Sequence, residues 1–325
     1  METALDAVRI GNPEIVPQAA MFNPMPSRCR QFRQSRVLIV GCGDVGLRAA
    51  RALLPRCRVL ALTTSAERAQ VLRAHGLLPL RGNLDEPATL ARLAGLAPHV
   101  LHLAPPPSHG HTDPRTAHLL QALSRRGATR ALVYGSTSGV YGDAGGARFD
   151  ETRPVAPASD RARRRVHAEA LVRWWGRRQA GGQGAHASVL RIPGIYALNR
   201  EGGDPRERVR RGTAVLAAQD DVYTNHIHAD DLARACVAAL WRGAPQRVVH
   251  ACDDTELRMG DYFDLVADLW GLERPPRLPA EEARATMSPL QWSFLSESRR
   301  LDNRRLKQEL RTSLRYPTVR DGLRG

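Results

Sequence analysis

The chain has 325 residues, of which 42% are hydrophobic and 25% charged, and its formal net charge is +15 at pH 7. This balance is typical of a globular protein that can bury a full α/β core, and no apolar run approaches the roughly 20 residues that span a bilayer. The positive charge would suit nucleic acid, but the cations are almost all scattered arginines and only 5% of the residues are aromatic, so we do not expect a nucleic-acid partner.

Residues 1–35 are expected to form a flexible tail. They contain four prolines and no apolar periodicity, and they lack the apolar stretch of a secretory signal. The five cysteines of the chain are scattered, without the paired spacing of a disulfide framework or a zinc site. We therefore expect reduced thiols and a cytoplasmic protein.

From residue 36 onward, stretches of β-formers alternate with helical patterns. Strands are predicted at 36–40, 58–62, 77–80, 99–103, 130–135, 187–192 and 247–251. Helices are predicted near 45–54, 66–74, 86–94, 113–125, 161–178, 230–241 and 259–270. Such an alternation predicts an α/β fold with a doubly wound, mostly parallel sheet.

The first predicted strand leads directly into the sequence GCGDVG at residues 41–46, which has the spacing G-x-G-x-x-G. In such a turn the first glycine makes the tight bend, the second lets the backbone approach a pyrophosphate, and the third lets the next helix pack on the strand. The phosphates bind N–H groups at the helix N-terminus. A strand before the turn and a helix after it favour a dinucleotide site, to which we assign Gly41, Gly43, Asp44, Val45 and Gly46.

The residues after the second strand bear on the choice of dinucleotide. A protein that selects NAD usually has an acidic residue there, which binds the ribose 2′-hydroxyl. In this chain Thr63 and Thr64 come first, Arg68 follows a turn later, and the first carboxylate is Glu67. Short hydroxyls and a nearby cation suit a 2′-phosphate, so we expect NADP to be preferred, while Glu67 leaves NAD open.

Several separated segments resemble the extended and atypical short-chain dehydrogenase/reductases, also described as NAD(P)-dependent epimerases/dehydratases. The resemblance rests on the glycine turn, on HLA at 102–104, and on STSGVYG at 136–142, RIPGIY at 191–196 and NHIHADD at 225–231. It implies a Rossmann domain at 36–195 and 227–251 and a smaller C-terminal substrate lobe at 196–226 and 252–325. It also implies cofactor contacts from residues that follow other strands of the sheet: Asn83, Leu84, Leu103, Ala104 and Pro193.

The resemblance implies a catalytic set of a Ser or Thr, a Tyr and a Lys. Thr137 occupies the hydroxyl position. Counting back from Glu169 places Arg161 and Arg165 where the family has its Tyr and Lys, and the only lysine of the chain, Lys307, lies too far away to restore the pair. The usual tyrosine-driven proton transfer is therefore not expected.

The two arginines change the chemistry that the site can perform. A guanidinium stays protonated, so Arg161 cannot donate a proton as a tyrosine does. Arg161 and Arg165 are four residues apart on one helix face, so both can point at the cofactor site as electrostatic clamps. Tyr141 and Tyr196 are the alternative proton donors. On the opposite side of this helix, we expect core packing from Val166, Ala170 and Trp174.

Three functional hypotheses stay open, of which nucleic-acid binding through the scattered arginines is the least favoured. The first is a reductase, epimerase or dehydratase that acts on a small anionic or sugar-like substrate, and the second is an NADP(H)-binding redox sensor without turnover. The pairs His109-x-His111 and His226-x-His228 lack a third ligand at a recognisable spacing, so no metal site is expected and Asp230 is expected to cap the following helix. The oligomeric state is left open.

Overall fold

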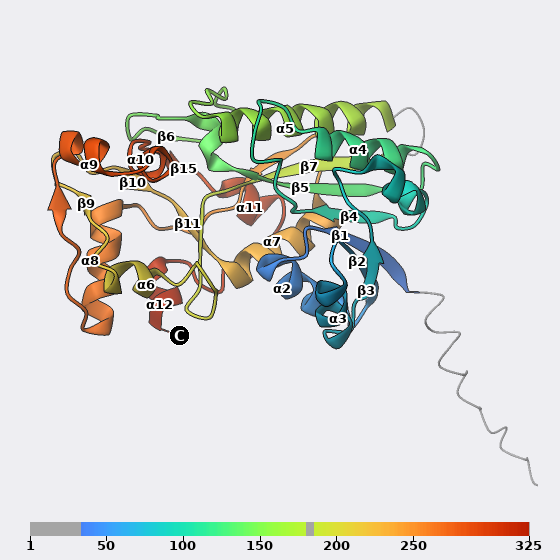
Figure 1. Ribbon diagram of the computed structural model, residues 1–325, viewed down its shortest axis with the longest axis horizontal. Helices are drawn as coiled ribbons and strands as arrows, with labels where there is room; N and C mark the ends of the chain where they lie inside the picture. The colour runs from blue at the N-terminus through green and yellow to red at the C-terminus, as the bar shows by residue number, and fades with distance from the viewer. Residues whose placement is uncertain (1–33, 180–184, 325) are drawn as a thin grey trace, which may run out of the picture. The chain divides into compact units, whose positions relative to one another are not determined.

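In a computed structural model, which describes residues 34–179 and 185–324, a seven-stranded parallel sheet forms the centre of the fold (Figure 1). The strand order is β12-β7-β5-β4-β1-β2-β3, so the order reverses between β1 and β4, as in a doubly wound Rossmann sheet. The predicted fold class is confirmed, and all seven predicted strands belong to this sheet. They are β1 (Ser35–Val40), β2 (Cys57–Thr63), β3 (Leu78–Arg81), β4 (His99–His102), β5 (Ala131–Thr137), β7 (His186–Ile192) and β12 (Val248–His250).

Helices cover both faces of the sheet (Figure 1). The strands are apolar on both sides, so one face buries Ile39 and Leu101 while the other buries Leu38 and Val100. The first face carries α2 (Asp44–Leu53), α3 (Ala66–Ala74), α7 (Ala229–Arg242) and α11 (Arg304–Gln308). The second carries α4 (Pro114–Ser124), α5 (Asp160–Gln179) and η1 (Pro87–Leu93), a 3₁₀ helix where the pattern predicted an α-helix.

A separate apolar core lies among the later segments and includes Val215, Phe263 and Leu323. It involves α6 (Pro205–Arg210), α8 (Met259–Trp270), α9 (Ala280–Thr286), α10 (Pro289–Leu295) and α12 (Val319–Arg324). Short strand pairs accompany these helices: β8 (Gly194–Tyr196) with β11 (His226–His228), β9 (Val215–Leu216) with β14 (Arg277–Leu278), β10 (Tyr223–Thr224) with β13 (Leu257–Arg258), and β6 (Arg148–Phe149) with β15 (Arg300–Leu301).

The chain from Ser35 onward clusters as a single compact unit, so the division into a Rossmann domain and a substrate lobe stays a prediction. Nearly all of the predicted N-terminal tail lies outside the described residues, and Ser35 at its end already belongs to β1. None of the helices in the described part of the chain is long and apolar enough to cross a membrane.

Candidate cofactor and substrate site

The glycine turn between β1 and α2 has one closed side and one open side. Gly41 has a φ of +83°, and a Cβ at this position would overlap the backbone of Ala104, so only glycine fits. A Cβ on Gly46 would lie 3.3 Å from the Sγ atom of Cys42, which shows how closely α2 packs on the turn. A Cβ on Gly43, in contrast, would meet no atom within 4 Å. The turn is therefore open for a ligand at Gly43.

The N-terminus of α2 fits an anionic ligand. Gly43 is the N-cap residue, and no side chain caps the helix. The N–H groups of the first turn, which includes Asp44 and Val45, therefore depend on solvent or a ligand for a partner. These features suit the pyrophosphate of a dinucleotide.

The residues expected near the adenosine end of the dinucleotide lie around the glycine turn. Ser65 accepts a hydrogen bond from the N–H of Arg68 (2.9 Å) and so caps α3. The Arg68 guanidinium then reaches back and donates to the carbonyl oxygen of Cys42 (2.7 Å). Thr63 is buried at the end of β2, and Thr64 is exposed beside it. Arg68 is thus fixed next to the glycine turn, where a cation could meet a phosphate.

Four other predicted cofactor positions lie after β3 and β4. The Asn83 amide donates to Glu86 Oε1 (2.8 Å) and accepts from the N–H of Asp85 (3.0 Å), so it closes its own turn after β3. Leu84 beside it is buried. Leu103 and Ala104 both donate through their N–H groups to the Val40 carbonyl (2.7 and 3.1 Å), which places their backbone against the glycine turn.

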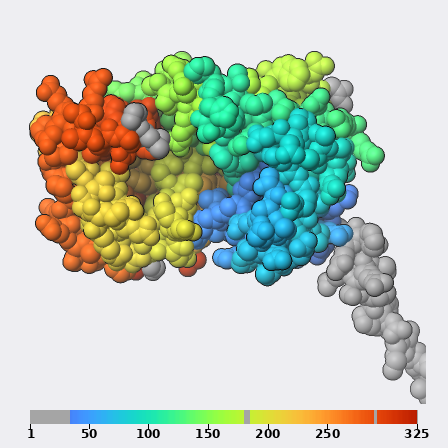
Figure 2. Space-filling model, in the orientation of Figure 1, coloured from blue at the N-terminus to red at the C-terminus, as the bar shows by residue number. Residues whose placement is uncertain are grey.

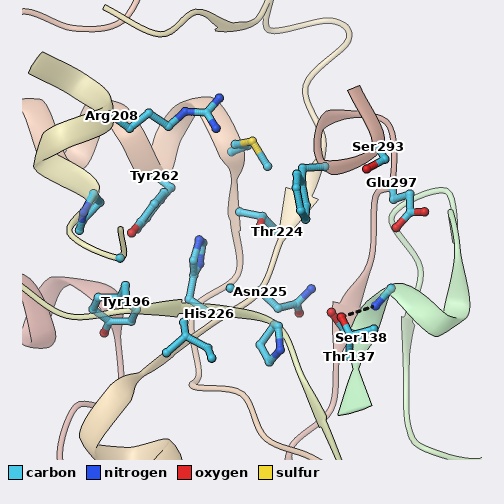
Figure 3. Close-up of a pocket in the computed structure, with 18 of the residues that line it drawn as sticks. Thr137, Ser138, Tyr196, Arg208, Thr224, Asn225, His226, Tyr262, Ser293 and Glu297 are labelled. Carbon is cyan, nitrogen blue, oxygen red and sulfur yellow. Dashed lines mark hydrogen bonds between the residues drawn. The ribbon is translucent and has the colours of Figure 1, made fainter. Parts of the chain in front are cut away.

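A cavity of about 630 Å³ lies where the C-terminal ends of β5 and β7 meet the later segments. Figure 2 shows the molecule hollowed between the orange-red residues near 280–295 and the yellow residues near 200–225. Thr137 and Ser138 form one end of this cavity, and Arg208 lies at the other end (Figure 3). Pro193 also lines the cavity.

The hydroxyl of Thr137 lies at the cavity wall. Its Oγ1 atom accepts a hydrogen bond from the N–H of Gly139 (3.3 Å), the contact dashed in Figure 3. Arg161 lines the same cavity, with its guanidinium carbon 5.1 Å from the centre of the Phe294 ring. Desolvation and the neighbouring Arg165 lower the pKa of Arg161, but an arginine still remains protonated at any working pH.

Arg165 does not line the cavity beside Arg161. Its Nη1 atom donates to the Gly135 carbonyl (2.7 Å) and to the Tyr134 hydroxyl (3.1 Å). The two arginines that were expected to face the ligand together therefore lie in different places. Arg161 faces the cavity, and Arg165 is hydrogen-bonded to the end of β5.

The side chain of Tyr141 is buried, and its hydroxyl group has hydrogen-bond partners within the protein. Its side chain is 1% exposed, and its hydroxyl is within hydrogen-bond distance of Arg191 Nη1 (2.5 Å) and His250 Nε2 (2.6 Å). Burial raises the pKa of Tyr141 to about 12, against the opposing effect of Arg191. Arg191 in turn forms a buried ion pair with Glu169 (2.7 Å). The structure therefore does not support the expected catalytic role of Tyr141 and gives it a place in a buried network instead.

Tyr196 and His226 also lie in the cavity wall, yet neither presents a ready proton donor. The Tyr196 hydroxyl donates to the Thr318 carbonyl (3.3 Å), and burial raises its pKa. His226 stacks on Tyr262 with ring centres 4.0 Å apart, and burial lowers its pKa to about 3, so it is neutral at pH 7.

The expectation that Asp230 caps α7 is wrong. His228 is the N-cap residue, and its Nδ1 accepts the hydrogen bond from the N–H of Asp230 (3.2 Å). The carboxylate of Asp230 binds Arg48 instead (2.5 Å). Among the described residues, no three His, Cys, Asp or Glu side chains gather as a metal site would require.

Sequence reasoning missed most of the charge in the cavity. Its wall carries five arginines: Arg161, Arg200, Arg208, Arg211 and Arg299. Arg299 pairs with Glu297 (2.6 Å), and Arg200 lies 3.3 Å from Asp44. Within the described part of the chain, the other three have no ion-pair partner.

Arg208 is held in place although no acidic side chain among the described residues forms an ion pair with it. Its guanidinium lies over the Phe263 ring at 4.6 Å, and its buried Nε has no hydrogen-bond partner among the described residues. Desolvation and, to a lesser extent, Arg211 lower its pKa. The only hint in the sequence was a run of arginines after Pro205, in a segment that sequence patterns leave irregular.

A glycine turn at the start of a doubly wound parallel sheet, with a second cavity at the ends of neighbouring strands, defines a Rossmann-type dinucleotide-binding protein. The sequence model of the NAD dependent epimerase/dehydratase family matches residues 37–252, and the chain belongs to this family. NAD(P) is the cofactor of the family. A comparison with curated protein sequences finds no match.

Solved structures share the fold over nearly the whole chain. A functionally unknown conserved protein from Silicibacter pomeroyi is 31% identical, with 90% of this chain and 97% of that chain covered and a TM-score of 0.73. UDP-glucose 4-epimerase from Thermotoga maritima, with UDP-glucose, is 18% identical, with 89% and 96% covered and a TM-score of 0.72. RMD from Pseudomonas aeruginosa, complexed with NADPH, is 20% identical, with 90% and 97% covered and a TM-score of 0.66. At such identities the last two show a common fold.

Proposed function

We propose that the protein is an NAD(P)-dependent reductase, epimerase or dehydratase that acts on a small anionic or sugar-like substrate. The observation that carries this proposal is the cavity itself. It places a threonine hydroxyl at one end and unpaired arginines on its walls, beside a fold that binds a dinucleotide. Two proteins that share the fold support the proposal: one was solved with UDP-glucose and the other with NADPH.

The charges of the cavity favour an anionic substrate. Its acidic residues are Asp204, Glu207 and Glu297. Asp204 pairs with Arg206 (2.7 Å) and Glu297 with Arg299 (2.6 Å). Glu207 then remains against the three unpaired cations Arg161, Arg208 and Arg211. An anionic group on the substrate would balance this excess through charge-assisted hydrogen bonds.

The residues at the Thr137 end would handle the reacting group. Thr137 accepts the N–H of Gly139, so its own hydroxyl proton is available for an oxygen of the substrate. Arg161 would bind a nearby anionic group or stabilise negative charge that develops on that oxygen. A bound nicotinamide supplies hydride transfer. The later segments at 196–226 and 252–325, which form the rest of the cavity wall, would act as the substrate lobe.

We assign a preference for NADP to the residues that follow β2. Arg68 is held against the glycine turn by its bond to the Cys42 carbonyl (2.7 Å). Thr63 and Thr64 offer short hydroxyls where a carboxylate would repel a phosphate. A 2′-phosphate would therefore find a cation and no acidic neighbour before Glu67.

The second candidate function is a redox sensor that binds NADP(H) without turnover. The burial of Tyr141 favours it, because Tyr141 then cannot stand in for the tyrosine that the resemblance places at Arg161. Such a protein would bind the cofactor and change its partner binding with the redox state of the nicotinamide.

The first experiment is a titration of the purified protein with NADPH and with NADH, followed by nicotinamide fluorescence. Binding with NADPH favoured supports the cofactor assignment, and failure to bind either would contradict it. NADPH oxidation, or exchange of a substrate C–H proton, is then measured on a panel of sugar phosphates, UDP-sugars and small carboxylates. Turnover that Arg161→Ala lowers supports the enzyme. Tight binding without turnover on the whole panel supports the sensor.

A further inference from the structure

The segment between β8 and α6, residues 197–204, folds back on itself and fixes one side chain. The N–H of Ala197 donates to the Gly203 carbonyl (3.2 Å), and the N–H of Gly203 donates to the Arg200 carbonyl (3.0 Å). A Cβ on Gly203 would overlap the guanidinium of Arg200. The absence of a side chain at Gly203 therefore leaves the space that Arg200 occupies.

Arg200 reaches from the cavity to the glycine turn. It lines the cavity, and its Nε lies 3.3 Å from the Oδ2 atom of Asp44 in the first turn of α2. A second link holds the same segment in place. Arg48 donates to Asn199 Oδ1 (2.7 Å) and also to Asp44 (3.1 Å). Arg200 thus stands between the substrate cavity and the place where a dinucleotide docks.

The Nε atom of Arg200 has no hydrogen bond within the described part of the chain. It is buried, and although Asp44 is near enough for an ion pair, no acceptor among the described residues meets the geometry of a hydrogen bond. A buried donor without an acceptor is costly. The turn beside it is open at Gly43, and the first turn of α2 has no side-chain cap. Both observations suit a ligand with acceptor oxygens at this point.

We propose that Arg200 is a cofactor-binding residue. Its guanidinium donates to an oxygen of the pyrophosphate bridge that docks on the glycine turn, and Asp44 is its positioning residue. The inference rests on the proposed NAD(P) function. It makes segment 197–204 a wall shared by the cofactor site and the substrate cavity.

The charges explain why an acidic residue is tolerated in the turn. Asp44 would repel a pyrophosphate if it were alone. Arg200 and Arg48 lie against it, and Arg48 also binds Asp230 (2.5 Å), so two cations balance two carboxylates. Removal of Arg200 would leave a net negative charge beside the pyrophosphate, whereas Asp44→Asn would leave a net positive one.

The test is NADPH affinity, measured by nicotinamide fluorescence on the full chain. Arg200→Ala should raise the Kd by about tenfold, as expected for the loss of one charge-assisted hydrogen bond. Arg210→Ala is the matched control: Arg210 is exposed on α6 and does not line the cavity, so the same loss of charge should leave the Kd unchanged. Thermal unfolding of each variant checks that it folds, and Arg200→Gln replaces the alanine variant if that one does not.

Two competitors of NADPH localise the effect. ADP-ribose 2′-phosphate contains the pyrophosphate, whereas adenosine 2′-monophosphate carries no phosphate at its 5′ position. Arg200→Ala should weaken the first and leave the second unchanged. Equal Kd values for the wild type and Arg200→Ala, or equal losses for both competitors, would overturn the assignment of Arg200. Failure of the wild type to bind NADPH would instead overturn the proposed cofactor function, on which the assignment rests.

Discussion

The buried carboxyl group of Asp253 should make the stability of the protein depend on pH. Its side chain is 4% exposed, Oδ1 accepts the N–H of Thr255 (3.0 Å), and Oδ2 has no hydrogen-bond partner among the described residues. Burial, helped by the nearby Asp254 and Asp231, raises its pKa to about 8 from an ordinary value of 3.8. The native protein therefore keeps a proton that the unfolded chain releases, and stability falls as the pH rises from 3.8 to about 8.

Asp253→Asn should remove this dependence, because an amide has the shape of the protonated carboxyl group and does not ionise. Each pH unit within that range is worth about 1.4 kcal/mol, so the stability of the variant relative to the wild type should rise by about 3 kcal/mol between pH 5 and pH 7. Groups that do not interact with Asp253 contribute equally in both proteins and cancel in the difference.

The measurement is urea unfolding of both proteins at pH 5, 6 and 7, with the free energy of unfolding extrapolated to water. The slope of free energy against urea should be the same for both proteins, which shows that their unfolding exposes a similar surface. A difference in stability that stays constant from pH 5 to pH 7 would refute the reasoning, because it would mean that Asp253 ionises in the native protein as it does in the unfolded chain.

Three further predictions concern the cofactor turn and the buried network. Arg68→Ala should raise the Kd for NADPH by about tenfold and leave that for NADH nearly unchanged, since only NADPH carries the 2′-phosphate; equal effects on both would contradict the assignment. Tyr141→Phe should lower stability by about 1–3 kcal/mol in urea unfolding, because Arg191 loses a buried acceptor, while NADPH affinity stays at the wild-type value. Gly41→Ala should abolish NADPH binding in the fluorescence titration, because the new methyl group overlaps the Ala104 backbone at a φ of +83°; binding at wild-type affinity would show that the turn can rearrange.

The sheet could be predicted from the sequence because most of its strands are buried on both faces, the edge strand β3 being the exception. Runs such as Val37–Val40 are then continuously apolar, and each is followed by a turn and a helix. The glycine turn could be recognised for a related reason. Its three glycines meet separate steric demands, and those demands are local to residues 41–46.

The orientation of α5 was harder to predict. The expected core residues Ala170 and Trp174 are exposed, and Trp174 instead lies against the guanidinium of Arg178 at 5.0 Å. The core side carries Val172 and Trp175. Arginines occur all around this helix, so the contrast between its polar and apolar sides is too weak to indicate which of two adjacent tryptophans is buried.

The cavity could not be predicted because its charges come from segments far apart in the sequence. Arg161 opens α5, Arg208 lies on α6, and Glu297 follows α10. No local spacing relates these residues, and the segments that carry two of them have only short helices and strands. The same holds for Arg200, whose contact with Asp44 depends on how residues 197–204 close on the glycine turn.

If Arg161 stands where the family has its tyrosine, as the resemblance implies, the chemistry that the cavity can support is narrower. A tyrosine exchanges a proton with the substrate oxygen, whereas a guanidinium holds its protons and offers a permanent positive charge. Tyr141 cannot take over, because Arg191 and His250 occupy its hydroxyl. Thr137 then remains the hydroxyl that we propose for contact with the substrate oxygen. We therefore infer that the site gains more from stabilising negative charge than from donating protons, which is why an anionic group on the ligand is the feature we expect it to recognise.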